Sequence, residues 1–379
     1  MKKDIEIKIS PAIQVIIIFG IISMLGDVIY ETARSANSQY FSLLGISATK
    51  VGLVFGVGEF LGYFLRLLTG VASDRSGNYW GFLFLGYGLL IVVPIIGFSQ
   101  NWNFLLILIL LERIGKALRN PSKDTVLSAV AENQVGVGFA FGLQEALDQI
   151  GAFLGPLIFT AVFYFTGKNG LREYQTAYKL LIIPFVTLML FLYFAKEKIT
   201  SEKLIPSLKG KEFRNEKLPL VFWYYSAFTF FCSLGFVNFS LIGYHLKSQQ
   251  IMSDGNITLL YSLAMAVDAI TALIIGKAYD SIKEKKKDAS SGLLLLLFLP
   301  IISILLPLFA LNNKGVYIAI GMLFFGIIMG VHETIMRSAI ADISPFYKRG
   351  TSYGIFNSVY GLALFAGAWF TGFLYEQRN

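Results

Sequence analysis

Acidic side chains recur at helical spacing inside the long apolar stretches of this sequence. Asp27 and Glu31 lie four residues apart in the first stretch, and Glu145 and Asp148 lie three apart in a later one. Residues at these spacings share one face of a helix. A carboxyl group in an apolar environment can bind and release a proton near neutral pH. We therefore take these four residues as candidates for proton coupling.

A second set of polar residues inside the apolar stretches suits the lining of a substrate cavity. An ionised side chain at mid-bilayer costs at least ~2.5–3.5 kcal/mol on insertion scales, so it normally faces a cavity or a partner. The cavity candidates are Glu59, Arg66, Glu112, Lys116, Asn238, Asp268, His332, Glu333, Arg337 and Asn357. For Arg66, Glu112 and Arg337 the alternative is a structural ion pair. For His332 it is a structural histidine beside Glu333.

The sequence lacks the patterns that several kinds of enzyme require. It has no G-x-x-x-x-G-K-[ST] loop, which an ATP-driven pump would need. His245 and His332 lie far apart, and neither has a second ligand at metal spacing. The single cysteine, Cys232, excludes an internal disulfide and a cysteine-based metal cage. We expect no enzymatic activity, no cofactor and no metal site.

The elements that must position these residues are apolar blocks of roughly 20 residues or more, long enough to cross a ~30 Å hydrocarbon core. Of the 379 residues, 55% are hydrophobic and only 15% are charged. Backbone groups cannot stay unpaired in lipid, so the blocks must be helical. The sequence therefore predicts an all-α polytopic membrane protein. The predicted spans are 11–33, 47–72, 80–99, 102–125, 138–166, 174–195, 218–246, 256–279, 290–311, 315–341 and 350–375.

Basic residues predict the orientation of the spans. They gather near the N-terminus, after the second, fourth, eighth and tenth spans, and in the polar segment 196–217. An excess of Lys and Arg marks cytoplasmic loops. We expect a multi-pass protein of the cell membrane with a cytoplasmic N-terminus. The net charge of +8 then belongs to these loops rather than to a nucleic-acid site.

The two halves of the chain resemble each other. Gly70 and Asp74 follow the second span as Gly276 and Asp280 follow the eighth. The fifth and eleventh spans share small residues at one constant offset, namely Gly138, Gly142, Gly151 and Gly155 against Gly350, Gly354, Ala363 and Gly367. Two parallel repeats are typical of a two-bundle transporter with its substrate site between the bundles. We expect bundles at 1–195 and 218–379, joined by a cytoplasmic linker at 196–217. Because a six-plus-six protein needs another span after Glu376, a twelfth helix is expected to be missing.

Three motifs resemble those of the major facilitator superfamily, and the resemblance covers essentially the whole chain. The loop after the second span reads Gly70-Val-Ala-Ser-Asp74-Arg75-Ser-Gly77 and resembles the family's G-x-x-x-D-R-x-G loop. Asn78 and Tyr79 replace its usual basic pair. Arg113 resembles the family's intramembrane arginine of span four. The spacing of Gly142, Gly151, Gly155 and Pro156 is similar to the glycine-rich motif of proton-coupled antiporters, with Phe159 and Thr160 where its last glycines are usual.

The resemblance implies the family's fold of two six-helix bundles and a role for each motif. The gating loop, Gly70, Asp74, Arg75 and Gly77, would help to lock the cytoplasmic end. Arg113 would take part in proton coupling. The glycines and Pro156 would let the fifth span bend and pack closely while the bundles rock.

These observations favour a secondary transporter that works by alternating access, with proton-driven export (antiport) of a small organic molecule as the first hypothesis. The alternative is proton-coupled uptake of a small anionic metabolite held by Arg66, Arg113, Lys116 and Arg337. A third hypothesis is a transport-silent receptor or scaffold, which would gain nothing from the insertion cost of buried charge. We expect protons, a small-molecule substrate and the lipid bilayer as partners, with no nucleic acid, and a monomer.

Overall fold

The computed structural model describes residues 10–46, 48–132, 135–168, 170–202, 217–237, 239–249, 251–252, 254–286 and 289–378. Within these ranges the chain is almost entirely helical, with short turns and no strand. This is the arrangement that a bilayer imposes, because helices satisfy their backbone hydrogen bonds internally. The predicted linker lies mostly outside the described residues.

The first half of the chain supplies helices for six of the predicted spans. They are α1 (Pro11–Leu43), α2 (Ala48–Ser76), α3 (Tyr79–Gly88), η1 (Leu89–Ile91), α4 (Val92–Ile96), α5 (Trp102–Ala131), α6 (Val137–Thr166), α7 (Leu171–Leu180) and α8 (Ile182–Ser201). The segments α3, η1 and α4 follow one another as a single span, and α7 and α8 form another. Most predicted boundaries hold to within about four residues, but α1 continues ten residues beyond its predicted end, and α5 and α8 each continue six.

The second half supplies the remaining five. They are α9 (Leu220–Leu234), α10 (Phe239–Ser248), α11 (Asp254–Lys286), η2 (Ala289–Phe298), α12 (Leu299–Ala310), α13 (Gly315–Ile343), η3 (Phe346–Lys348) and α14 (Arg349–Arg378). In the described part of the chain, six helical stretches from both halves are long and apolar enough to cross a membrane. The long helix α5 is not among them because Glu112, Arg113, Lys116 and Arg119 interrupt its apolar run.

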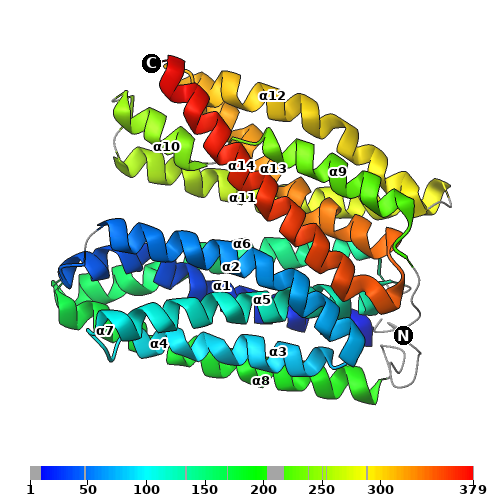
Figure 1. The fold of residues 1–379 in the computed structure, drawn as a ribbon, viewed down its shortest axis with the longest axis horizontal. Helices are drawn as coiled ribbons and strands as arrows, with labels where there is room; N and C mark the ends of the chain where they lie inside the picture. The colour runs from blue at the N-terminus through cyan, green and yellow to red at the C-terminus, as the bar shows by residue number, and fades with distance from the viewer. Residues whose placement is uncertain are drawn as a thin grey trace, which may run out of the picture.

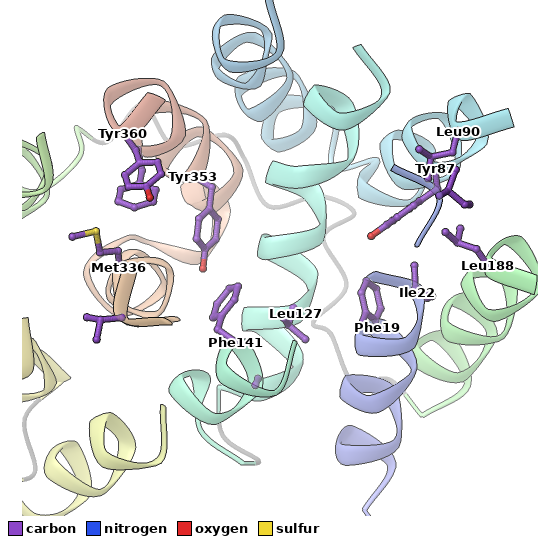
Figure 2. Close-up of a cluster of buried hydrophobic side chains, with 14 of the residues drawn as sticks. Phe19, Ile22, Tyr87, Leu90, Leu127, Phe141, Leu188, Met336, Tyr353 and Tyr360 are labelled. Carbon is purple, nitrogen blue, oxygen red and sulfur yellow. The ribbon is translucent and has the colours of Figure 1, made fainter. Parts of the chain in front are cut away.

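The helices form two bodies that lie side by side (Figure 1). Helices α1–α8 make up one body, α9–α14 make up the other, and the long helices of both run along the same general direction. Across the boundary, α2 packs on α14 and α6 packs on α11. Aromatic side chains fill part of this boundary, where Phe141 of α6 points toward Tyr353 of α14 with ring centroids 6.1 Å apart (Figure 2).

Glycines allow the closest approaches between helices. A Cβ atom on Gly142 of α6 would lie 2.3 Å from the carbonyl oxygen of Ala272 in α11, and one on Gly151 would lie 2.3 Å from that of Met24 in α1. Helix α6 continues without interruption through Pro156. The glycine motif thus packs α6 against both bodies at once, which supports close packing; bending of the helix during transport stays a prediction.

Candidate functional site

The residues of the predicted gating loop join the two bodies at one end of their boundary, through a contact that we call the α2–α14 lock. Asp74, near the end of α2, accepts hydrogen bonds from the backbone N–H groups of Gly350 (2.9 Å) and Thr351 (2.5 Å) at the start of α14. The hydroxyl of Tyr79 donates a third, at 2.8 Å. A carboxylate is well placed here because the first N–H groups of a helix lack partners within it. Burial raises the pKa of Asp74 to about 6.

The other two residues of the gating loop support this geometry. Gly70 lies so close to α14 that a Cβ atom on it would come within 2.2 Å of the carbonyl oxygen of Gly350. Gly77 ends the helix with a φ of 62°, a left-handed conformation that favours glycine. Arg75 is exposed beside them.

The second repeat forms an equivalent contact, the α6–α11 lock. Asp280 of α11 accepts hydrogen bonds from the backbone N–H groups of Gly138 (3.1 Å) and Phe139 (2.7 Å) at the start of α6. A Cβ atom on Gly276 would lie 2.3 Å from the carbonyl oxygen of Gly138. The sequence repeat therefore has a structural counterpart, in which each half of the chain contributes an aspartate that caps a helix of the other half.

Further along the α2–α14 contact, Arg66 reaches across the boundary. Its Nη1 donates a hydrogen bond to Oδ1 of Asn357 in α14 at 3.2 Å, and its guanidinium lies 4.6 Å from the centroid of the Tyr63 ring. Arg66 and Asn357 are both buried. The structure thus joins two predicted cavity residues from opposite halves.

On α5, the predicted polar stripe meets α1. Arg113 forms an ion pair with Glu112 at 3.4 Å and donates a hydrogen bond to the hydroxyl of Tyr30. The Nζ of Lys116 lies 3.9 Å from the centroid of the same tyrosine ring. Tyr30, Glu112 and Arg113 also line a pocket that continues along α1 to Asn37.

Five predicted residues from three helices meet at the boundary and form what we call the acid cluster: Glu145 and Asp148 of α6, Asp268 of α11, and Glu333 and Arg337 of α13. Arg337 forms an ion pair with Glu333 and lies 3.9 Å from Oε2 of Glu145. Asp268 lies within electrostatic range of Glu333, Arg337 and Asp148. The cluster therefore has four carboxyl groups and one arginine.

Asp268 is the most isolated member of the acid cluster. Its exposed fraction is 0%, and neither carboxyl oxygen has a hydrogen-bond partner among the described residues. By contrast, Glu145 accepts a hydrogen bond from the side chain of Gln149 at 2.8 Å, and Asp148 accepts one from Gln144 at 3.4 Å. Buried polar atoms are normally paired, so an unpaired carboxyl group calls for an explanation.

Asp27 and Glu31 occupy different environments although they share a helix face. Glu31 forms an ion pair with Arg34 of its own helix at 3.2 Å, on a partly exposed surface. Asp27 lies deeper, within electrostatic range of Asp148, Lys116 and Lys123. The structure therefore connects Asp27 to the acid cluster and leaves Glu31 with a local partner.

The remaining candidates have varied positions. His332 is buried, with Nδ1 3.3 Å from the hydroxyl of Tyr360, and its ring packs edge-on against that tyrosine. The position of Asn238 and the side chain of Glu59 lie outside the described residues.

Sequence reasoning missed Asp124 of α5, whose exposed fraction is 2% and which lies within electrostatic range of Arg337 and Lys123. Its place at the predicted end of a span made it look like a loop residue, whereas α5 continues to Ala131.

Comparisons with known proteins agree with this architecture. The family model of the Major Facilitator Superfamily matches residues 12–368. An uncharacterised protein of Mycobacterium tuberculosis, Rv2265, is 36% identical over 365 residues, covering 95% of this chain and 86% of that protein. An uncharacterised MFS-type transporter of Methanocaldococcus jannaschii, MJ1317, is 26% identical over 371 residues, covering 95% of this chain and 88% of that protein.

Solved structures with the same fold include the fucose:proton symporter FucP of E. coli and the human organic anion transporter MFSD10. The first has a TM-score of 0.67 at 13% identity, with 97% of this chain and 93% of that chain covered. The second has a TM-score of 0.66 at 15% identity, with 95% and 93% covered. At these identities the likeness shows the fold alone. The family match and the sequence relatives establish that this all-helical, polytopic membrane protein is a transporter rather than an enzyme, and that it belongs to the Major Facilitator Superfamily.

Proposed function

We propose that this protein is a proton-coupled secondary transporter that exports a small organic molecule by alternating access across the cell membrane, with its N-terminus in the cytoplasm. The observation that carries the proton coupling is Asp268, a fully buried carboxyl group that has no hydrogen-bond partner among the described residues. A charged group inside a membrane protein costs free energy unless it is paired. A carboxyl group avoids that cost when it binds a proton and becomes neutral, and the binding is reversible.

The acid cluster supports a proton site because its charges do not balance. Glu145, Asp148, Asp268 and Glu333 face Arg337, and the buried Lys123 lies within electrostatic range of Asp148, so four carboxyl groups are set against two cations. Closely spaced carboxyl groups disfavour one another's ionised forms, so the cluster needs additional positive charge, which protons supply. The cluster also lies on α6, α11 and α13, at the boundary that must change when the bodies rock. Proton binding there would alter the boundary directly.

We propose export because the glycine spacing of α6 resembles the motif of proton-coupled antiporters. The glycines of this motif contact both bodies. Gly142 approaches α11 of the second body, while Gly151 and Gly155 approach α1 of the first. Uptake of an anionic metabolite is the second candidate, and the observation in its favour is Arg66, a buried cation at the boundary. The orientation follows from the basic residues of the predicted cytoplasmic loops.

Transport by purified protein in liposomes tests this function. With an imposed pH gradient, we expect a substrate to accumulate in the acidic compartment for antiport, whereas accumulation in the alkaline compartment would establish uptake instead. Asp268→Asn should abolish accumulation driven by the pH gradient but keep substrate exchange in the absence of a gradient. Glu284→Gln, an exposed acid on the same helix, is the matched control. Equal accumulation by Asp268→Asn and the control would refute the assigned proton site, and absence of any flux would favour a receptor or scaffold.

A further inference from the structure

Arg66 is a buried cation that forms no salt bridge among the described residues, although the buried Asp124 of α5 lies within electrostatic range. Its exposed fraction is 8%, and its Nε has no hydrogen-bond partner in the described part of the chain. Arginine stays protonated at any physiological pH, so it cannot relieve this cost by losing its charge. Its partners are a neutral amide, Asn357, and the ring of Tyr63. Burying a charge without a partner is costly, and a bound anion would remove that cost.

A second cation lies near Arg66. Lys116 of α5 lies within electrostatic range of both Arg66 and Arg113. Its ammonium group sits over the ring of Tyr30 and forms no ion pair with a described carboxylate. Glu112 pairs with Arg113, and Asp27 lies within electrostatic range of Lys116. Arg66 has no carboxylate within salt-bridge distance among the described residues, so it is the cation of this group that is most open to a bound anion. Such a site suits a carboxylate or phosphate group.

Arg66 belongs to the same helix pair as the α2–α14 lock. It lies two helical turns before Asp74 on α2, and Asn357 lies two turns after Gly350 on α14. The bond between Arg66 and Asn357 therefore adds to the contact that holds this end closed. A ligand that takes the guanidinium away from Asn357 would weaken that contact.

The two repeats carry different charges at equivalent positions beside their locks. Asn357 lies seven residues after Gly350, and Glu145 lies seven residues after Gly138, so they occupy equivalent positions. One helix pair joins the bodies through a buried cation, whereas the equivalent pair carries the acid cluster. The repeats thus place sites for opposite charges at the two locks.

We propose that the substrate carries an anionic group, a carboxylate or a phosphate, which binds Arg66 in place of Asn357, with Lys116 nearby, and thereby loosens the α2–α14 lock. Protons act at the other helix pair, through the acid cluster. This inference rests on the proposed transport function and names the chemistry of its substrate. For antiport the two ligands act in turn: the bodies change state with either the anion or the proton bound, but not with both, which couples the two fluxes.

Thermal stability of the purified full chain in detergent tests the anion site. The probes are benzoate, succinate and glycerol 3-phosphate, with benzyl alcohol and benzylammonium as neutral and cationic counterparts. We expect at least one anion to raise the melting temperature, and the neutral and cationic compounds to have no effect. Arg66→Gln should weaken the Kd of that anion on the order of 10- to 100-fold, because a charge-assisted contact is lost. Arg172→Gln, at an exposed arginine of α7, is the matched control.

Asn357→Ala separates this proposal from a purely structural role of Arg66. If the anion replaces Asn357, the variant should bind the anion at least as tightly as wild type. Stabilisation by neutral or cationic compounds alone, by no anion, or equally in Arg66→Gln would overturn the proposal, as would weaker anion binding by Asn357→Ala. A flux driven by the pH gradient that carries only neutral or cationic compounds would refute the anion site while leaving the proposed function intact.

Discussion

Adding a single methyl group at Gly70 should open the end of the boundary that the two locks close. A Cβ atom on Gly70 would lie 2.2 Å from the carbonyl oxygen of Gly350, whereas ordinary contacts begin at 3.4 Å, so α2 and α14 must separate by about 1.2 Å. The hydrogen bond from Gly350 N to Asp74, now 2.9 Å, would then exceed 4 Å and be lost.

The size of the effect follows from the bonds that break. Hydrogen bonds to a charged group contribute about 1.5–3 kcal/mol each, and Asp74 accepts two from the backbone of α14. At the lower end of this range, the loss of both bonds destabilises the closed state by about 3 kcal/mol. That is a shift of roughly 100-fold in the equilibrium between closed and open states. Gly276→Ala, at the equivalent position of the other lock, should act in the same direction.

Labelling of a buried cysteine measures this opening. Ser338 of α13 has an exposed fraction of 0%, and its hydroxyl approaches the carbonyl oxygen of Val137 in the other body, so Ser338→Cys reports separation of the bodies. The native Cys232 is first replaced by Ser. Gly88→Ala is the control, since a Cβ atom there meets nothing within 4 Å. If Gly70→Ala were labelled no faster than Gly88→Ala, the close approach of α2 and α14 would not be what keeps this end closed.

Three further predictions follow from single contacts. Burial raises the pKa of Asp74 to about 6 in the closed state, so the stabilisation that protonation of Asp74 adds to the hydrogen-bonded contact is full below its ordinary pKa of 3.8 and is lost as pH rises through about 6. Labelling of the buried cysteine should therefore increase from pH 5 to pH 7 in wild type and stay flat in Asp74→Asn; identical profiles would contradict this assignment. Gly151→Ala places a Cβ atom 2.3 Å from the Met24 carbonyl oxygen, and the overpacking should cost about 1–3 kcal/mol, seen as a lower melting temperature. Glu132→Ala leaves the buried Arg349 without its carboxylate partner at 2.9 Å and should destabilise the fold by about 1–2 kcal/mol; an unchanged melting temperature would show that the pair contributes nothing.

The sequence by itself determined the elements of this protein. Apolar blocks long enough to cross a bilayer must be helices, so the helical segments could be placed to within a few residues at most of their ends. The spacing of Gly70 and Asp74, repeated at Gly276 and Asp280, predicted a gating contact in each half. Both signals are local, because hydropathy and short spacings do not depend on how the helices pack.

Only the tertiary structure decided which charged residues meet. The sequence favoured Asp27 and Glu31 because they share a helix face, yet Glu31 pairs with Arg34 while Asp27 faces the acid cluster. Glu145 and Asp268 are more than a hundred residues apart and belong to opposite bodies, so no periodicity relates them. Glu112 and Arg113 form a salt bridge, whereas Arg66 forms none among the described residues and instead bonds to the neutral Asn357. Which of these occurs depends on the packing of helices from both halves. The sequence therefore determines which charges enter the membrane, and the packing of the two bodies determines which of them stay unpaired.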